Sequence, residues 1–266
     1  MKLGCCLNMN AVGNFKIGEE CIPVFSGLGY DYVELPLAQI MDLSEDSFSF
    51  LLQTIKECGI PLEACNNFFP AGIRLTGENA EPGAALEYAR RACGRAAALG
   101  AKIIVLGSSG AKNIPFGFPY EKARAQFTEL LGRLQEIVLP LGITIVLEPL
   151  NRNESNFIVN VDEALSVMNE ASCGNIKLLV DYYHMCMENE DPVEAVRKAG
   201  NNLRHVHIAA RQGREFPRPG DGHDYAAFFA ALKDAGYDGR VSVEAYSNNL
   251  PGDAEASAAL IRSFIK

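Results

Sequence analysis

The sequence predicts a (β/α)₈ barrel, and the spacing of its glycines is the main reason. Seven segments with helical periodicity each run into a glycine, and an apolar strand begins two to four residues later. These junction glycines are Gly29, Gly59, Gly100, Gly142, Gly174, Gly200 and Gly236. Glycine readily takes the left-handed conformation that ends a helix. The expected strands are continuous apolar runs, as in parallel strands that helices cover on both faces.

The expected strands follow in order from these junctions. The first, LGCCL (3–7), opens the chain before any helix. The next seven lie within YDYVEL (30–35), IPLEAC (60–65), AKIIVL (101–106), ITIVL (143–147), IKLLV (176–180), LRHV (203–206) and RVSV (240–243). A helical segment precedes each of these seven, and a last helix at 253–265 closes the chain. Eight alternating strands and helices in about 250 residues are typical of a (β/α)₈ barrel, so we expect one catalytic domain over residues 1–266.

A doubly wound open sheet is the alternative fold for strands and helices in alternation. That fold more often carries a glycine-rich phosphate loop after its first strand. The corresponding segment here, LNMNAVGNF (7–15), lacks that pattern. The barrel is therefore the preferred prediction.

Composition excludes several classes of protein. The chain is 48% apolar but has no apolar run long enough to span a bilayer. Its net charge of −9 provides no overall basic surface for nucleic acid and leaves only a local basic patch open. The start, MKLGCCLNMN, is too short and mixed for a secretory signal, and the eight cysteines form no CxxC motif. We therefore expect a cytoplasmic protein with reduced cysteines, and neither a membrane nor a nucleic acid as partner.

Four consecutive predicted strands end in a possible metal ligand. Glu148 follows ITIVL and precedes Pro149, which disfavours helical geometry and keeps Glu148 extended. Asp181, His207 and Glu244 occur at the ends of the next three strands. A single carboxylate in this position often faces solvent or caps the next helix. Four possible metal ligands at successive strand ends, on the side of the barrel where catalytic residues lie, indicate a metal site.

Three carboxylates that point inward would lie too close together to ionise without compensation, and a divalent cation would supply it. Three carboxylates and an imidazole suit Mn²⁺, which we favour, or Mg²⁺, Co²⁺ or Zn²⁺. Glu148 and Glu244 follow strands three apart in the ring and could face opposite sides of a sugar. Proton removal beside a carbonyl by one and return by the other gives epimerisation. If one side does both steps, the result is aldose–ketose isomerisation, and neither reaction needs an organic cofactor.

The motifs LEPLNRNE (147–154), VDYYHM (180–185), HVHIA (205–209) and VSVEAY (241–246) resemble those of the xylose isomerase-like TIM barrels. The resemblance is strongest to the sugar isomerases and epimerases of the D-tagatose/D-psicose 3-epimerase and hydroxypyruvate isomerase branch. It implies a metal-dependent isomerase or epimerase that acts on a ketose or related small carbohydrate through an enediolate. It also implies one metal held by Glu148, Asp181, His207 and Glu244, with the two glutamates as the catalytic pair.

The same resemblance implies the residues that bind substrate. Glu154 and His184 match the positions that hold substrate oxygens, and an arginine shortly after the metal histidine matches a third contact. The loop AARQGREFPRPGDGHDY (209–225) offers Arg211, Arg214 and Arg218 for this role. We favour Arg214, because GR ahead of a PG-x-G turn recurs in the wider family. The loop is longer than in the 3-epimerases, so the sugar and any phosphate on it stay open.

Five further polar residues are weaker candidates. Glu34 could orient a metal ligand from behind or form a salt bridge. His205 shares a strand face with His207 and is expected one layer deeper, behind the site or in the core. His223 is expected to be a loop residue, whereas Asn66 and Ser108 are placed to line the pocket.

Other functions fit part of the pattern. HIAARQGREF (207–216) with PGDG also resembles the inosose dehydratases, which would use the same metal and bases. Endonuclease IV-type DNA-repair enzymes share the barrel but need three zinc ions and more than four histidines. A non-enzymatic sugar-binding barrel should have lost a ligand, and all four are present. A homodimer or homotetramer is compatible with the sequence.

Overall fold

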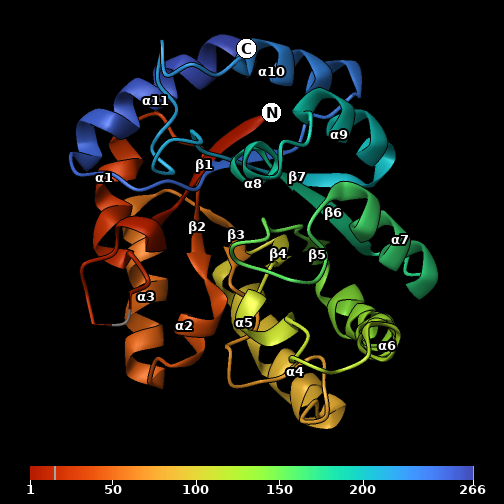
Figure 1. Ribbon diagram of the computed structural model, residues 1–266. Coiled ribbons are helices and arrows are strands. Elements are labelled where there is room, and N and C mark those ends of the chain that lie inside the picture. Colours follow the sequence, from red (N-terminus) through yellow and green to blue (C-terminus); the bar gives the residue numbers. More distant parts are fainter. Residues whose placement is uncertain (15, 266) are drawn as a thin grey trace.

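The chain forms a closed parallel barrel of eight strands in the computed structural model, which describes residues 1–14 and 16–265 (Figure 1). Neighbouring strands pair in chain order, and β8 pairs with β1. The strands are β1 Lys2–Cys6, β2 Tyr32–Pro36, β3 Leu62–Asn66, β4 Ile103–Leu106, β5 Thr144–Leu147, β6 Ile176–Asp181, β7 Leu203–Ile208 and β8 Arg240–Val243. The predicted (β/α)₈ fold is confirmed, although the first strand begins and ends one residue earlier than expected.

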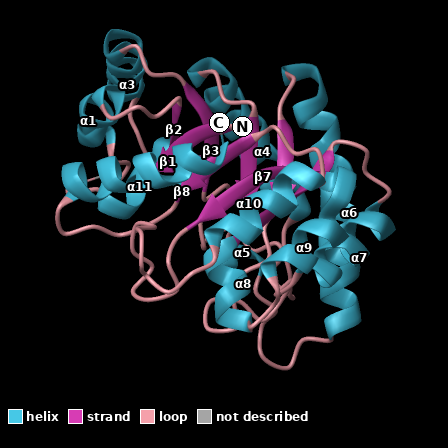
Figure 2. Cartoon of the chain, turned by 90° about the horizontal axis from the view of Figure 1, so that it is seen from above, coloured by secondary structure: helices cyan, strands magenta, loops and turns pink. Residues whose placement is uncertain are grey.

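Helices surround the barrel, and Figure 2 shows the strands enclosed between them. The outer helices are α1 Ile22–Gly27, α3 Glu45–Cys58, α4 Pro82–Leu99, α6 Tyr120–Val138, α7 Val161–Ala171, α9 Pro192–Ala199, α10 Tyr225–Asp234 and α11 Leu250–Ile265. Short 3₁₀ helices are η1 Leu7–Asn10, η2 Glu19–Cys21, η3 Leu139–Leu141 and η4 Gly200–Asn202. None of the helices in the parts of the chain that the structure describes is long and apolar enough to cross a bilayer.

Three further short helices follow strands at the carboxyl end of the barrel. They are α2 Leu37–Met41 after β2, α5 Ser109–Lys112 after β4 and α8 Tyr182–Glu188 after β6. The sequence did not predict them, because helices of four to seven residues are too short to show a hydrophobic period. They lie where the loops of a barrel enzyme form its site.

Six of the seven junction glycines have positive φ, between 47° at Gly200 and 96° at Gly100. Gly174 does not. The helix α7 ends earlier, and Ser172 takes the left-handed conformation with φ 50°. The Ser172 hydroxyl donates to the carbonyl of Asn169, a local bond that supports a non-glycine cap. The strand that follows still begins at Ile176, as predicted.

The barrel interior is built in layers, because residues two apart on a strand share a face. The lower layer is an apolar cluster of Tyr32, Ala64, Ile103, Val105, Val146 and Leu179. Two residues after Val146 and Leu179 come Glu148 and Asp181, and the same step leads from Tyr32 to Glu34. The alternation that fills the barrel floor therefore also turns the strand-end carboxylates inward.

Gly4 in β1 makes room for the Tyr32 ring in that floor. A Cβ atom at Gly4 would lie 2.2 Å from Tyr32 Cζ. We expect Gly4→Ala to lower the free energy of unfolding by about 1–3 kcal/mol, the usual effect of overpacking a core. Urea denaturation followed by circular dichroism measures it.

The matched control is Gly94→Ala, within α4, where a Cβ atom would meet nothing within 4 Å. This substitution should raise the free energy of unfolding by roughly 0.5–1 kcal/mol, because alanine is the better helix former. If Gly4→Ala were as stable as the wild type, the close packing of Tyr32 on β1 would be wrong.

Candidate metal centre

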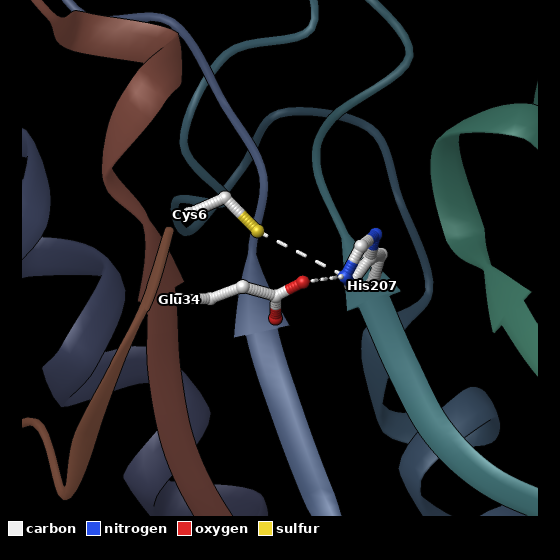
Figure 3. A group of neighbouring side chains, drawn as sticks. All are labelled: Cys6, Glu34 and His207. Carbon is white, nitrogen blue, oxygen red and sulfur yellow. Dashed lines mark hydrogen bonds and ion pairs between the residues drawn. The ribbon is translucent and has the colours of Figure 1, made fainter. Parts of the chain in front are cut away.

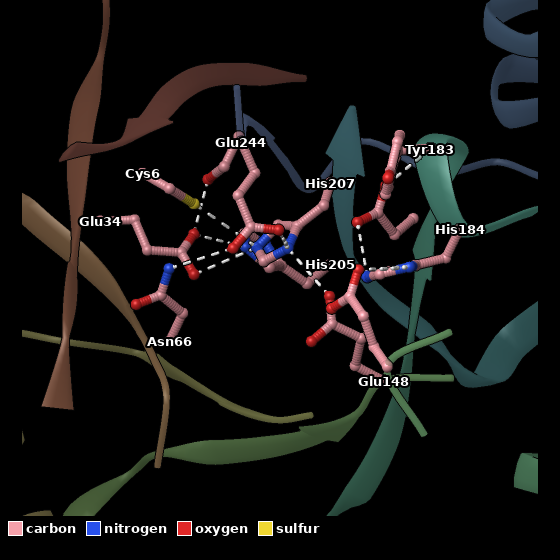
Figure 4. Close-up of polar contacts among 12 residues, drawn as sticks. Cys6, Glu34, Asn66, Glu148, Tyr183, His184, His205, His207 and Glu244 are labelled. Carbon is pink, nitrogen blue, oxygen red and sulfur yellow. Dashed lines mark hydrogen bonds and ion pairs between the residues drawn. The ribbon is translucent and has the colours of Figure 1, made fainter. Parts of the chain in front are cut away.

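The side chains of Glu148, Asp181, His207 and Glu244 converge at the carboxyl end of the barrel. One possible ligand atom from each lies within 4.8 Å of those of the other three. The Nδ1 atom of His207 is 3.1 Å from Glu148 Oε1 and 3.2 Å from Glu244 Oε2, so the ring stands between the two glutamates (Figure 4). All four residues are at most 9% exposed. The structure brings together the set that the sequence singled out, and its role in binding a metal stays a prediction.

The end of β4 makes space for the carboxylate of Glu148. The main-chain N–H of Glu148 donates to the carbonyl of Leu106 at 3.3 Å, which extends the β4–β5 pairing by one residue. Gly107 follows Leu106 in the chain, and a Cβ atom at Gly107 would lie 2.1 Å from Glu148 Oε2. Any other residue at 107 would therefore displace this carboxylate from the site.

Asp181 both caps a helix and faces the site. Its Oδ1 atom accepts a hydrogen bond of 2.8 Å from the main-chain N–H of Tyr183 and so caps the N-terminus of α8. Its Oδ2 atom lies 3.5 Å from Arg214 Nη2 and 3.5 Å from His184 Nε2. The capping bond fixes the orientation of the carboxylate and leaves the second oxygen directed into the site.

Of the three loop arginines, Arg214 is the one that reaches the carboxylates. Its guanidinium is ion-paired with Glu244 and lies 4.7 Å from the centre of the Tyr183 ring. The Arg214 side chain is 14% exposed, whereas Arg211 is exposed and Arg218 pairs with Glu215 at the surface. The backbone of Arg214 has φ 51°, a left-handed conformation that is uncommon for a residue other than glycine.

Burial and neighbouring charges shift the pKa values of the three carboxylates in different directions. Burial raises the pKa of Glu148 and raises the pKa of Asp181 to about 7. At Glu244 burial acts in the same direction, but Arg214 and His207 outweigh it and lower the pKa to about 2. The cluster therefore resists full ionisation by itself. A donor set of three carboxylates and one imidazole nitrogen fits a divalent cation, which would compensate this charge.

His184 and Glu154 lie beside the cluster and are joined through Asn151. The Nδ1 atom of His184 accepts from the main-chain N–H of Asn151 at 3.2 Å, so the proton of a neutral ring is on Nε2. Among the described residues, Nε2 has no hydrogen-bond partner, although it is buried. Glu154 Oε1 accepts from Asn151 Nδ2 at 3.0 Å and lies 3.6 Å from Arg214 Nη1. An unused buried donor and a half-exposed carboxylate are suited to holding hydroxyl and carbonyl oxygens.

Lys112 is a site residue that sequence reasoning missed. This lysine is fully buried, and its Nζ donates to the carbonyl of Phe157 at 2.9 Å and lies 3.5 Å from those of Glu148 and Ile158. Ile158 has φ 61°, a strained value for a β-branched residue. Lys112 therefore ties together the two ends of the loop after β5. Its sequence context, SSGAKNIPF, resembles an ordinary surface turn and gives no signal of burial.

Of three lesser candidates, two are buried beneath the cluster and one lies in a loop. His205 is fully buried one layer below His207, as expected, and its Nε2 is 2.8 Å from Glu34 Oε2. His223 lies in the loop before α10, where its Nε2 accepts from the main-chain N–H of Arg211 at 3.0 Å. Glu34 is fully buried and contacts both barrel histidines.

Comparison with known proteins gives three consistent likenesses. A ketose 3-epimerase from Arthrobacter globiformis is 31% identical over 84% of this chain and 75% of its own length. An L-ribulose 3-epimerase from Methylomonas sp. (strain DH-1) is 35% identical over 48% of this chain, but that match spans only 44% of the relative. The crystal structure of a D-psicose 3-epimerase in the presence of D-fructose superposes with a TM-score of 0.86, covers 100% of this chain and 99% of that one, and is 22% identical.

The family model described as the xylose isomerase-like TIM barrel matches residues 24–264. That range contains β2 to β8 and all four residues of the candidate metal centre. The chain therefore belongs to the xylose isomerase-like TIM barrel family.

Proposed function

We propose that this protein is a divalent-metal-dependent sugar epimerase that inverts the carbon next to the carbonyl of a ketose. The observation that carries the proposal is the position of Glu148 and Glu244, which approach His207 Nδ1 from β5 and β8, three strands apart. Two carboxylates on different sides of one site are what inversion by proton transfer requires. Family membership and the epimerase activities named for the relatives support the same reaction class.

Glu148, Asp181, His207 and Glu244 would hold the cation, for which we propose Mn²⁺. When bound, a divalent ion supplies Lewis-acid polarisation of a carbonyl and an adjacent hydroxyl. Burial of the four side chains excludes water from these groups and strengthens every charge interaction within the site. Glu148 and Glu244 thus combine metal binding with acid and base roles.

The proton steps use the two glutamates in turn. One carboxylate removes the proton from the carbon beside the carbonyl, which leaves the substrate as an enediolate. The other delivers a proton to the opposite face, so the configuration at that carbon is inverted and no net proton is gained or lost. The unused Nε2–H of His184, the Arg214 guanidinium and the Glu154 carboxylate would hold the sugar oxygens during this exchange.

The rival functions differ in the carbon that receives the proton and in whether the substrate loses water. An aldose–ketose isomerase would move the proton between neighbouring carbons, and a dehydratase would expel water from the substrate. For an endonuclease IV-type enzyme the chain has only four histidines and a net charge of −9. The cytoplasmic location, the single domain and the homo-oligomeric state stay predictions from the sequence.

The metal roles can be tested by substitution. Metal-free wild type, prepared with EDTA, should bind one Mn²⁺ per chain in isothermal titration calorimetry. His207→Ala should weaken that binding by more than ~100-fold, beyond the ~10–100-fold typical of residues behind a metal site. His184→Ala should bind Mn²⁺ nearly as the wild type does but lose turnover, because we assign His184 to substrate oxygens. Three ions per chain, or metal loss in His184→Ala instead, would contradict the assignment.

The proton transfer can be tested by turnover in D₂O with Mn²⁺-loaded protein and a panel of free and phosphorylated ketoses and inososes. Deuterium should appear at C3 of both epimers, read by nuclear magnetic resonance (NMR). Glu148→Gln and Glu244→Gln should each slow exchange by ~10²–10⁴-fold, the usual contribution of a general acid or base. Label at C1 of the ketose would indicate an isomerase, and loss of water from an inosose would indicate a dehydratase. Near-full turnover in both variants would rule out the paired-glutamate mechanism.

A further inference from the structure

Glu34 lies directly beneath the candidate metal centre and gathers three side-chain donors. Its Oε1 atom is 3.1 Å from His207 Nε2, and its Oε2 atom is 2.8 Å from His205 Nε2 and 2.6 Å from Ser242 Oγ. The Ser242 hydroxyl is also 2.7 Å from the hydroxyl of Tyr32. All of these residues are fully buried. Contacts at both oxygens prevent the carboxylate from rotating, so Glu34 is a fixed acceptor in the floor of the site.

The two nitrogens of His207 face different surroundings. Nδ1 faces Glu148 and Glu244, the candidate metal ligands, whereas Nε2 faces Glu34 and Cys6 (Figure 3). A histidine that binds a metal through one nitrogen must offer a lone pair there and carry its proton on the other nitrogen. An ionised carboxylate can only accept a hydrogen bond. Glu34 therefore stabilises the ring form with the proton on Nε2 and the lone pair on Nδ1.

We propose that Glu34 is a positioning residue that fixes the tautomer and the orientation of His207, and thereby sets the metal affinity of the site. The inference rests on the proposed metal-dependent function. The proposed role of Glu34 differs from that of a plain salt bridge, because the effect of Glu34 reaches the metal through the far side of the His207 ring. His205 and Ser242 act one step further away, since they hold Glu34 in place.

Cys6 offers a competing interpretation of the same group. Its Sγ atom is 3.8 Å from His207 Nε2, and Cys6, Glu34 and His207 have possible ligand atoms within 4.8 Å of one another (Figure 3). A second ion bound there would take Nε2 as a ligand, which excludes a proton on that atom. The three donors that already contact Glu34 favour the hydrogen-bonded arrangement. The two interpretations predict different proton positions and different metal stoichiometries.

Glu34→Gln is the sharpest test, because it keeps the shape and replaces one oxygen by an amide donor. Because Ser242 and His205 contact Oε2, the retained oxygen stays there and the amide nitrogen faces His207. That amide favours a lone pair on Nε2 and a proton on Nδ1, in competition with the metal. We expect the Kd for Mn²⁺, from calorimetry on metal-free protein, to rise by ~10–100-fold. The control is Glu63→Gln, which removes a carboxylate paired with Lys2 and Arg240 at the other end of the barrel, and its Kd should match the wild type.

A second measurement observes the proton itself. In the Zn²⁺-loaded wild type, long-range ¹H–¹⁵N NMR should place the His207 proton on Nε2, with the signal assigned by comparison with His205→Gln and His184→Ala. This spectrum keeps the inference testable even if Glu34→Gln does not fold. A proton on Nδ1, or a second Zn²⁺ that is lost in Cys6→Ser, would overturn it.

The outcomes separate this inference from the function on which it rests. A wild type that binds no Mn²⁺ would overturn the proposed function, and the role of Glu34 with it. A wild type that binds Mn²⁺, together with a folded Glu34→Gln that binds it equally well, would overturn the role of Glu34 alone.

Discussion

Three carboxylates buried around one histidine are the arrangement on which the carboxyl end of this barrel depends. Glu148, Asp181 and Glu244 lie within 4.8 Å of one another and of His207, where like charges in water-poor surroundings repel strongly. The barrel imposes this convergence, because the inward face that packs Val146 and Leu179 in the floor continues to Glu148 and Asp181 two residues later. The surrounding structure is consequently organised to compensate the charge and to hold the groups in place.

The compensation comes from loops whose backbone is locally strained. Several non-glycine residues with left-handed φ lie in segments that follow strands, among them Asn67 after β3, Ser108 after β4, Ile158 after β5 and Arg214 after β7. Arg214 places a guanidinium on Glu244, and Lys112 gathers the carbonyls beside Ile158. Such conformations cost free energy and persist where the surroundings fix them, most often at functional sites. Their concentration on the site face supports the assignment of this end of the barrel to chemistry.

Local signals in the sequence predicted most of the fold and the convergent cluster. A junction glycine, an apolar run and a carboxylate at its end are adjacent in the chain, so strand order and inward direction followed from them. Gly174 was assigned wrongly because a left-handed serine can replace a capping glycine when its hydroxyl bonds the preceding turn. Local signals could not predict the contacts of Glu34 or the burial of Lys112. The contacts of Glu34 join residues 171 and 173 positions apart, and the contacts of Lys112 join residues 36 to 46 positions apart.

The most direct test of this account is a crystal structure of the Mn²⁺-loaded protein with an anomalous difference map recorded for manganese. The account predicts one strong peak within bonding distance of Glu148, Asp181, Glu244 and the Nδ1 atom of His207, with Nε2 still directed at Glu34. A peak at another place, no peak at all, or an ion bound through Nε2 would contradict it.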